Sequence, residues 1–209
     1  MSKENTTQLV LLLRSGKTAW DDDGRLQGRT DLPLSENGRT SFIAGIPSAL
    51  GQDEQGFPAV HHGPDEASKE SANLIAERLG AKLKQIKGFG GMDVGLWDGL
   101  LENELTDRYP RAVKQWREDP LLVTPPEGET IPELADRLLS TLIKVCEKAG
   151  EKPIAIVLRP IAFSLLACLL TGKGTGGLWE MVQEGPSSER TTVNLKQLKD
   201  LIESHRASV

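Results

Sequence analysis

The residues of this sequence that could do chemistry are cationic, hydroxylated or imidazole side chains at the ends of short apolar runs: Arg14, Ser15 and Lys17 after a first run, His62 at the end of a weaker second run, and Arg159 after a third. Guanidinium and ammonium groups stabilise an oxyanion, whereas a serine attacks a substrate only when an adjacent base activates it. By strand position His62 is the nearest candidate base for Ser15. The pattern predicts a positively charged site.

The apolar runs indicate the strands that position these side chains. Residues 8–13 and 155–158 are continuous apolar runs that stop at turn signals, as strands buried on both faces do, and 59–62 is a weaker candidate. Helical patterns cover 65–79, 132–149 and 161–170, with Pro64 at a first helical position and Thr130 as a cap. Alternating strands and helices predict an α/β fold whose ligands lie at the carboxyl ends of the strands.

Composition bounds the class of protein. The 209 residues are 26% charged and 38% apolar with a net charge of −5, which is ordinary for one globular domain over 1–209 with a core of about 8–195. No basic patch stands out, so a nucleic-acid binder is not expected. The longest apolar stretch is about half of a bilayer's span, and the polar N-terminal tail has no signal core, which predicts a cytoplasmic protein. Cys146 and Cys168 are expected as buried free thiols.

Four ordered segments resemble the histidine phosphatase (phosphoglycerate mutase-like) superfamily: Leu11-Leu12-Leu13-Arg14-Ser15-Gly16-Lys17-Thr18, then 24–39 with its Gly-Arg-Leu-Gln-Gly-Arg-Thr-Asp-Leu-Pro-Leu-Ser core, then Asp93-Val94-Gly95-Leu96-Trp97-Asp98-Gly99, then Pro126-Glu127-Gly128-Glu129-Thr130. The resemblance as a whole extends over residues 8 to about 170. The resemblance implies a three-layer α/β/α fold with a mostly parallel sheet. It also implies phosphoryl transfer through a phosphohistidine, with cations around the transferring oxygens and a glutamate that protonates the leaving group.

The residues at the family's pocket positions differ from the family pattern, and only Arg14 is kept: Ser15 stands for the nucleophilic histidine, Asp21 for an asparagine, Ala67 for the second arginine, Gly91 for the acid and Arg159 for the second histidine. Lys17 also replaces an acidic residue. The sequence has only three histidines, of which His205 is predicted to lie in a flexible tail. No realignment of the chain therefore supplies a histidine after both strands.

These substitutions predict a pseudophosphatase with a binding or regulatory role, whose ligand is a protein partner or a phosphorylated small molecule. The alternative is a phosphomonoesterase or mutase that works by an altered mechanism, and a purely structural or oligomer-forming role stays open. We expect the ligand-binding residues to be Arg14, Ser15, Lys17, Asp21, Arg25, His62 and Arg159. No cofactor and no metal site is predicted.

The charges of this pocket suggest a specific rearrangement. Asp21 places a carboxylate near Arg14 and Arg159, and an unpaired charge in a partly buried site is costly. We therefore expect the arginines to be neutralised internally, with Asp21 as the partner. Trp20 and Trp97 are expected to pack within the protein, and the glycine-rich segment 172–177 is interpreted as a connector because it lacks the spacing of a phosphate-binding loop.

Overall fold

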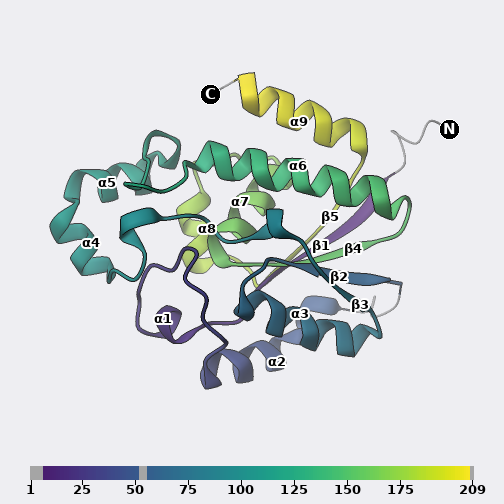
Figure 1. Ribbon diagram of the computed structural model, residues 1–209. Helices are drawn as coiled ribbons and strands as arrows, with labels where there is room; N and C mark the ends of the chain where they lie inside the picture. Colours follow the sequence, from purple (N-terminus) through teal and green to yellow (C-terminus); the bar gives the residue numbers. More distant parts are fainter. Residues whose placement is uncertain (1–6, 52–55, 208–209) are drawn as a thin grey trace.

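The computed structural model describes residues 7–51 and 56–207. The predicted N-terminal tail lies mostly outside these residues. Five strands form one sheet in the order β3-β2-β4-β1-β5 (Figure 1), with bounds β1 Gln8–Arg14, β2 Ala59–His62, β3 Lys82–Gln85, β4 Ile154–Leu158 and β5 Ser188–Val193. β1 pairs in parallel with β4, β4 with β2, and β2 with β3, whereas β5 runs antiparallel to β1.

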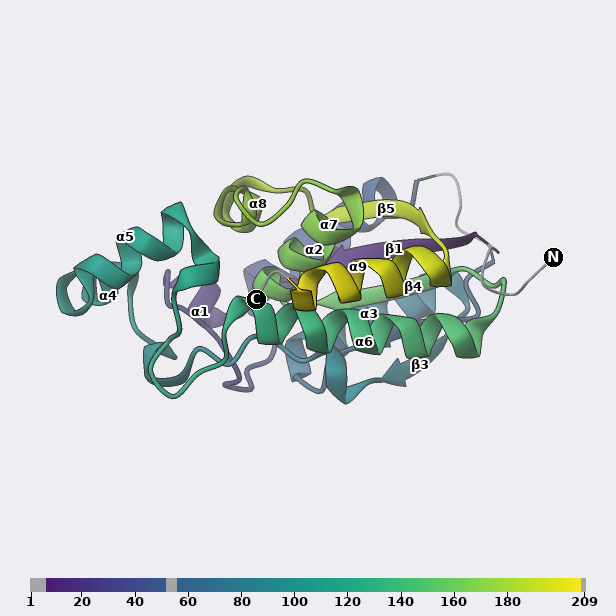
Figure 2. The same ribbon diagram turned by 90° about the horizontal axis from the view of Figure 1, so that it is seen from above.

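Helices cover both faces of the sheet, so the predicted α/β/α architecture is confirmed. Their bounds are α1 Ala19–Asp22, α2 Glu36–Leu50, α3 Glu66–Leu79, α4 Glu102–Arg108, α5 Pro110–Glu118, α6 Ile131–Ala149, α7 Pro160–Thr171, α8 Leu178–Glu184 and α9 Leu195–Ala207. Helices α2 and α3 lie below the sheet in Figure 1, and α6, α7 and α9 lie above it. Figure 2 shows α4 and α5 at one end of the molecule, beyond the sheet.

The central strand β1 is buried on both of its faces, as its apolar run predicts. Val10 and Leu12 belong to the core cluster under α6 and α7, while Leu11 and Leu13 belong to the cluster over α2 and α3. Successive side chains of a strand point to opposite faces, so an uninterrupted apolar run serves both layers at once. The carboxyl end of β1 is thereby fixed between two packed cores.

The two edge strands were not predicted. All four residues of β3 are exposed, and the sequence Ser-Glu-Arg-Thr-Thr-Val of β5 is mostly polar. Because neither strand buries two apolar faces, neither leaves an apolar run in the sequence. Their places in the sheet come from backbone pairing with β2 and β1.

Several local predictions can be compared with the structure. Thr130 caps α6 and both cysteines are free and buried, as predicted. The predicted position of Pro64 was wrong: Asp65 is the N-cap of α3, since its carboxylate accepts a hydrogen bond from the Ser68 N–H. His205 does not lie in a flexible tail, because it belongs to α9, which packs on α6.

No helix within 7–51 or 56–207 is long and apolar enough to cross a membrane.

Candidate active-site pocket

The ends of β1 and β4 bring two arginines together. Arg14, the last residue of β1, is in register with Leu158, the last residue of β4, and Arg159 follows directly. The Ser15 N–H donates to the Leu158 carbonyl at 2.8 Å, which extends the parallel pairing by one residue. Parallel strands release their loops at the same edge of the sheet, so Arg14, Ser15 and Arg159 share one site.

A one-turn helix holds Asp21 over this site. Thr18 is the N-cap of α1 and forms a capping box with Asp21: the Asp21 N–H donates to Thr18 Oγ1, and Asp21 Oδ2 accepts from the Thr18 N–H at 2.8 Å. A capping box satisfies two backbone donors at the start of a helix and fixes the rotamers of both side chains. Contacts with the N-cap of its own helix therefore hold the Asp21 carboxylate in place, independently of its contacts with other elements.

Asp21 forms an ion pair with Arg159 at the centre of the site. The Arg159 Nη2 donates to Asp21 Oδ1 at 3.0 Å and to Oδ2 at 2.8 Å, and also to Gln27 Oε1 at 2.9 Å. Its Nη1 donates to Ser15 Oγ at 3.2 Å. Arg159 is only 3% exposed. The predicted internal neutralisation is confirmed for Arg159.

Arg14 is satisfied in a different way. Its Nη2 donates to the Val182 carbonyl of α8 at 2.7 Å, and Asp21 acts on it only through space. Burial lowers the pKa of the Arg14 guanidinium, with Arg159 adding to this effect and Asp21 opposing it. The prediction that both arginines pair with a carboxylate is thus confirmed for Arg159 and wrong for Arg14.

A cavity of about 390 Å³ opens beside the ion pair. It is lined by six of the seven predicted ligand-binding residues: Arg14, Ser15, Lys17, Asp21, Arg25 and Arg159. Its other walls include the side chains of Trp116, Ile161 and Trp179. Arg117 and Glu102 also line the cavity, so its lining contains five cationic residues and two carboxylates in all. The lining therefore combines an excess of cationic residues with apolar side chains.

His62 is the predicted residue that does not line this cavity. Strand order explains why: β4 lies between β2 and β1, so two inter-strand spacings of about 4.8 Å each separate the backbones of His62 and Ser15. Its Nδ1 lies 2.6 Å from the Gly63 carbonyl. The side chain is buried, and burial lowers the pKa of His62. The structure does not bring His62 to Ser15 as a base.

The two remaining positions that the sequence resemblance singled out hold small residues. Ala67 is buried in the first turn of α3. Gly91 packs beside Arg159: a Cβ built there would lie 3.5 Å from Arg159 Cγ and 2.9 Å from the Gly28 carbonyl oxygen. A side chain at position 91 would therefore require the Gly28 segment to shift.

Sequence reasoning missed the side chains that support the site. Arg137 of α6 donates to the carbonyls of Gly88, Gly90 and Gly91 at 3.0 Å and to Glu129 Oε1 at 2.6 Å. Glu129 in turn accepts from the Asp93 N–H at 2.7 Å. This network fixes the loop that carries Gly91. In the sequence, only the family motif that contains Glu129 indicated part of this network. Arg137 could not be predicted, because its carbonyl partners are set by the path of the folded backbone.

The aromatic side chains pack within the protein, as expected for Trp97. Its ring is buried and stacks on Trp116 with centroids 4.8 Å apart, and Trp116 also contacts Trp179. Trp20 lies against Gly99. The tryptophan cluster joins α5 to α8 and so forms the apolar wall of the cavity. In the described part of the chain, no group of three His, Cys, Asp or Glu side chains is arranged to hold a metal ion.

Comparison with known proteins places this chain in a family. Residues 10–199 match the model of the histidine phosphatase superfamily (branch 1), so the chain belongs to that superfamily. It is 24% identical over 195 residues to phosphoserine phosphatase 1 of Hydrogenobacter thermophilus, with 90% of each chain covered. It is 30% identical over 169 residues to a probable phosphoglycerate mutase GpmB of Serratia proteamaculans, covering 78% of this chain and 73% of that one.

Solved structures agree with the fold. A mycobacterial glucosyl-3-phosphoglycerate phosphatase in complex with VO3 superimposes with a TM-score of 0.74 at 23% identity, covering 88% of this chain and 90% of that one. A phosphoglycerate mutase from Bacillus anthracis has the same TM-score at 17% identity, covering 96% and 99%. The predicted phosphoglycerate mutase-like α/β fold is therefore confirmed.

Proposed function

We propose that this chain is a non-catalytic member of the superfamily that binds a small anionic ligand in the cavity beside Arg159. One observation carries the proposal: the Asp21 carboxylate forms an ion pair with Arg159, the residue that the sequence resemblance aligns with the family's second histidine. Phosphoryl transfer needs a positive cradle that is open to the developing charge of the transferring group. A guanidinium already neutralised by a carboxylate offers that charge little further stabilisation.

The residue at the nucleophile position supports the same proposal. The hydrogen bond that reaches Ser15 Oγ comes from Arg159, a cation that cannot accept a proton at neutral pH. A serine nucleophile requires an adjacent base, and His62 lies beyond β4. Removal of an enzyme's nucleophile has cost on the order of a million-fold in kcat. We therefore expect no useful turnover from Ser15.

The cavity keeps features of a binding site. Its lining has three more cationic than carboxylate residues, and Lys17 extends an exposed ammonium group at its mouth. Trp116 and Trp179 supply an apolar wall. This combination favours an organic anion with an apolar body over inorganic phosphate. We place the protein in the cytoplasm as part of the proposal, in accordance with its two unpaired thiols.

The second candidate function is a phosphomonoesterase or phosphomutase with an altered mechanism. The names of the relatives favour it, since they are called phosphatases and mutases. This candidate requires that a group other than a histidine accept the phosphoryl group, and Ser15 is the side chain placed for it.

A hydrolysis assay separates the two candidates. Purified protein is incubated with p-nitrophenyl phosphate, phosphoserine and 3-phosphoglycerate, in parallel with Ser15→Ala and with Ser187→Ala, an exposed serine outside the cavity lining. We expect background release of phosphate from all three proteins. Turnover by the wild type and Ser187→Ala that disappears in Ser15→Ala would overturn the proposal and establish the enzyme.

A thermal-shift screen with organic phosphates and carboxylates tests the binding role directly. We expect at least one compound to raise the Tm of the wild type and not of Lys17→Gln. If no compound in the panel raised the Tm, the small-ligand role would be contradicted and a structural role supported.

A further inference from the structure

A second cavity lies on the other side of the Gly88–Gly91 loop. It has a volume of about 1180 Å³ and runs between α6 and the β2–β3 end of the sheet. Figure 2 shows β3 lying beyond the edge of α6, so this end of the sheet lacks a covering helix on the α6 face. Ala59 and His61 of β2, which are both buried, and the half-buried Ile86 after β3 line the cavity on the sheet side. We call this cavity the β3 groove.

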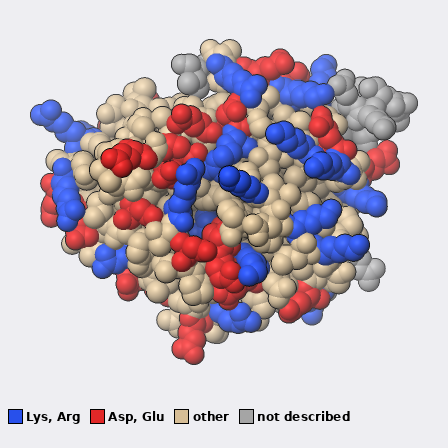
Figure 3. All heavy atoms as spheres, in the orientation of Figure 1, with Lys and Arg blue, Asp and Glu red and all other residues tan. Residues whose placement is uncertain are grey.

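Five lysines line the β3 groove: Lys84 and Lys87 from the sheet side, Lys144 and Lys148 from α6, and Lys152 from the turn after α6. Figure 3 shows Lys and Arg side chains gathered on this face. Because the two sets lie far apart in the sequence, the expectation that no basic patch stands out was wrong for the folded chain. Chain connectivity brings β3 and α6 to opposite walls of one space.

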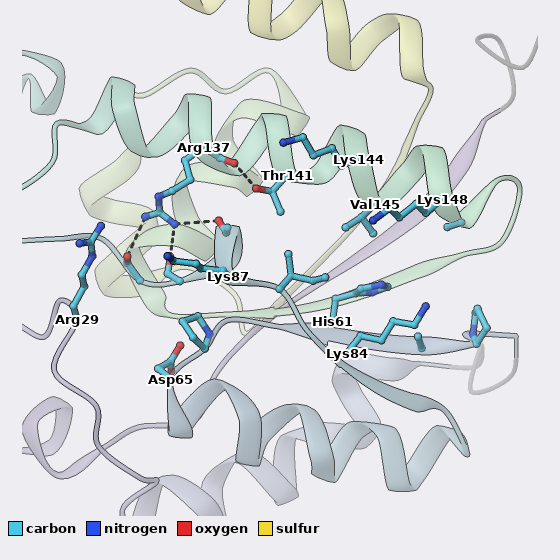
Figure 4. A pocket seen from close by; sticks show the side chains of 18 of the residues that line it. Arg29, His61, Asp65, Lys84, Lys87, Arg137, Thr141, Lys144, Val145 and Lys148 are labelled. Carbon is cyan, nitrogen blue, oxygen red and sulfur yellow. Dashed lines mark hydrogen bonds between the residues drawn. The ribbon is translucent and has the colours of Figure 1, made fainter.

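The charge of the β3 groove is opposite in sign to that of the protein. Seven lysine and arginine residues line it against two carboxylates, whereas the chain as a whole has a net charge of −5. The two carboxylates are Asp31 and Asp65. Asp31 accepts from the N–H of Glu66, the residue after Asp65, and Figure 4 shows Asp65 at the end of the groove near Arg29. Within the described ranges, no carboxylate forms a salt bridge with any of the five lysines. Their ammonium groups are exposed and available to a ligand.

The framework of the β3 groove is rigid although its lysines are exposed. Arg137 lies two turns and Thr141 one turn before Lys144 on the same helical stripe, and their side chains are occupied by hydrogen bonds within the protein. The loop approaches α6 so closely that a Cβ at Gly88 would lie 2.0 Å from Thr141 Oγ1. The two walls are thus fixed relative to each other.

The spacing of the ammonium groups indicates more than one anionic group in the ligand. Lys144 and Lys148 are one helical turn apart, about 6 Å along the axis. Figure 4 shows them on the α6 wall, with Lys84 and Lys87 on the opposite wall. Cations on both walls and on two turns of the helix offer contacts to more than one phosphate group. Lysine binds phosphate as a point charge and tolerates varied orientation, which suits a chain of phosphates.

We propose that the β3 groove binds a small organic polyphosphate, a molecule with two or more phosphate groups. A long polyanion is disfavoured because the acidic remainder of the surface repels whatever extends beyond the groove. The site is separate from the cavity beside Arg159 and does not depend on the presence or absence of catalysis there.

Isothermal titration calorimetry of the full chain with sodium tripolyphosphate tests this proposal at 50 mM and 300 mM NaCl. The variant Lys84→Gln/Lys148→Gln removes one cation from each wall, and the matched control Lys173→Gln/Lys196→Gln removes two exposed lysines outside the groove. We expect 1:1 binding that weakens at least about tenfold in the groove variant and less than about twofold in the control. Orthophosphate should bind at least about tenfold more weakly than tripolyphosphate.

Four outcomes would overturn the proposal. The first is no binding of tripolyphosphate at 50 mM NaCl, and the second is equal weakening by the groove and control variants, which would indicate only general charge attraction. The third is loss of binding in Lys17→Gln with no loss in the groove variant, which would place the ligand beside Arg159. A 20-nucleotide single strand that bound more tightly than tripolyphosphate, and lost affinity in the groove variant, would assign the groove to nucleic acid instead.

Discussion

Replacing Asp21 by asparagine removes the charge of the central ion pair with almost no change of shape. The amide oxygen of the new side chain can still accept from the Thr18 N–H and from Arg159, so the capping box and part of the pocket geometry survive. What is lost is the counter-charge of a guanidinium that is 3% exposed. The variant therefore isolates the electrostatic contribution of Asp21 from its steric one.

The size of the effect follows from the burial of the two partners. Removing one partner of a fully buried pair costs about 3–5 kcal/mol, because the other charge stays buried without compensation. The Asp21 side chain is 18% exposed, and Arg159 keeps acceptors on Ser15, Gly16 and Gln27. We therefore expect a loss of about 2–4 kcal/mol in the free energy of unfolding. For a chain of this length, that corresponds to a fall in Tm of roughly 5–15 °C.

Urea denaturation of a double-mutant cycle measures this effect. The variants are Asp21→Asn, Arg159→Met and the double variant, with Asp23→Asn as the control. Asp23 lies two residues away, is 63% exposed and comes only within 3.9 Å of Arg25, so its loss should cost less than about 0.5 kcal/mol. In the Arg159→Met background, Asp21→Asn should cost far less than alone. A coupling energy below about 0.5 kcal/mol would refute the role assigned to this pair.

The packing and titration of other groups give three further predictions. Gly91→Glu should lower the free energy of unfolding by about 1–3 kcal/mol in urea denaturation, since its Cβ would lie 2.9 Å from the Gly28 carbonyl oxygen; a variant as stable as the wild type would contradict this. Burial raises the pKa of the Cys146 thiol to about 12, so it should react with Ellman's reagent at pH 8 only after unfolding, and rapid native labelling would contradict this. Burial lowers the pKa values of His61 and His62, so the unfolded state takes up protons first as the pH falls. The Tm should decrease from pH 7.5 to 5.5, and His61→Gln should make that decrease shallower; an unchanged slope would refute the assignment to His61.

The sequence predicted the parts of the fold that are buried on two faces. The apolar runs of β1 and β4, the periodic pattern of α6 and the nearly continuous apolar segment of α7 can be recognised from the order of residues alone. The exposed strand β3 was missed because edge strands are stabilised by backbone pairing with a neighbour, which leaves no apolar signature. The residues after the runs of β1 and β4 were sufficient to predict the pocket, since both runs end at the same edge of the sheet.

The contacts within the site were predictable only in part. That Asp21 pairs with an arginine could be inferred from the cost of buried charge, but the sequence did not distinguish Arg14 from Arg159. Which arginine pairs with Asp21 depends on α8, because the Val182 carbonyl of α8 accepts a hydrogen bond from the Arg14 guanidinium. His62 was placed near Ser15 because the strand order was unknown, and β4 between them removes the contact.

The residues at the altered pocket positions depend on one another physically. Arg159 is stable in its buried position because Asp21 compensates its charge, and its side chain has room because position 91 is a glycine. Changing Arg159 to histidine alone would remove the main cation that faces the Asp21 carboxylate, and restoring a glutamate at position 91 alone would press its Cβ toward Arg159 and the Gly28 segment. A reversion at one position therefore destabilises the others before it adds any catalytic group. Under the proposed function, phosphohistidine chemistry would require simultaneous change at positions 15, 21, 67, 91 and 159, and a single change toward the family residue at position 21, 91 or 159 should lower stability without producing turnover.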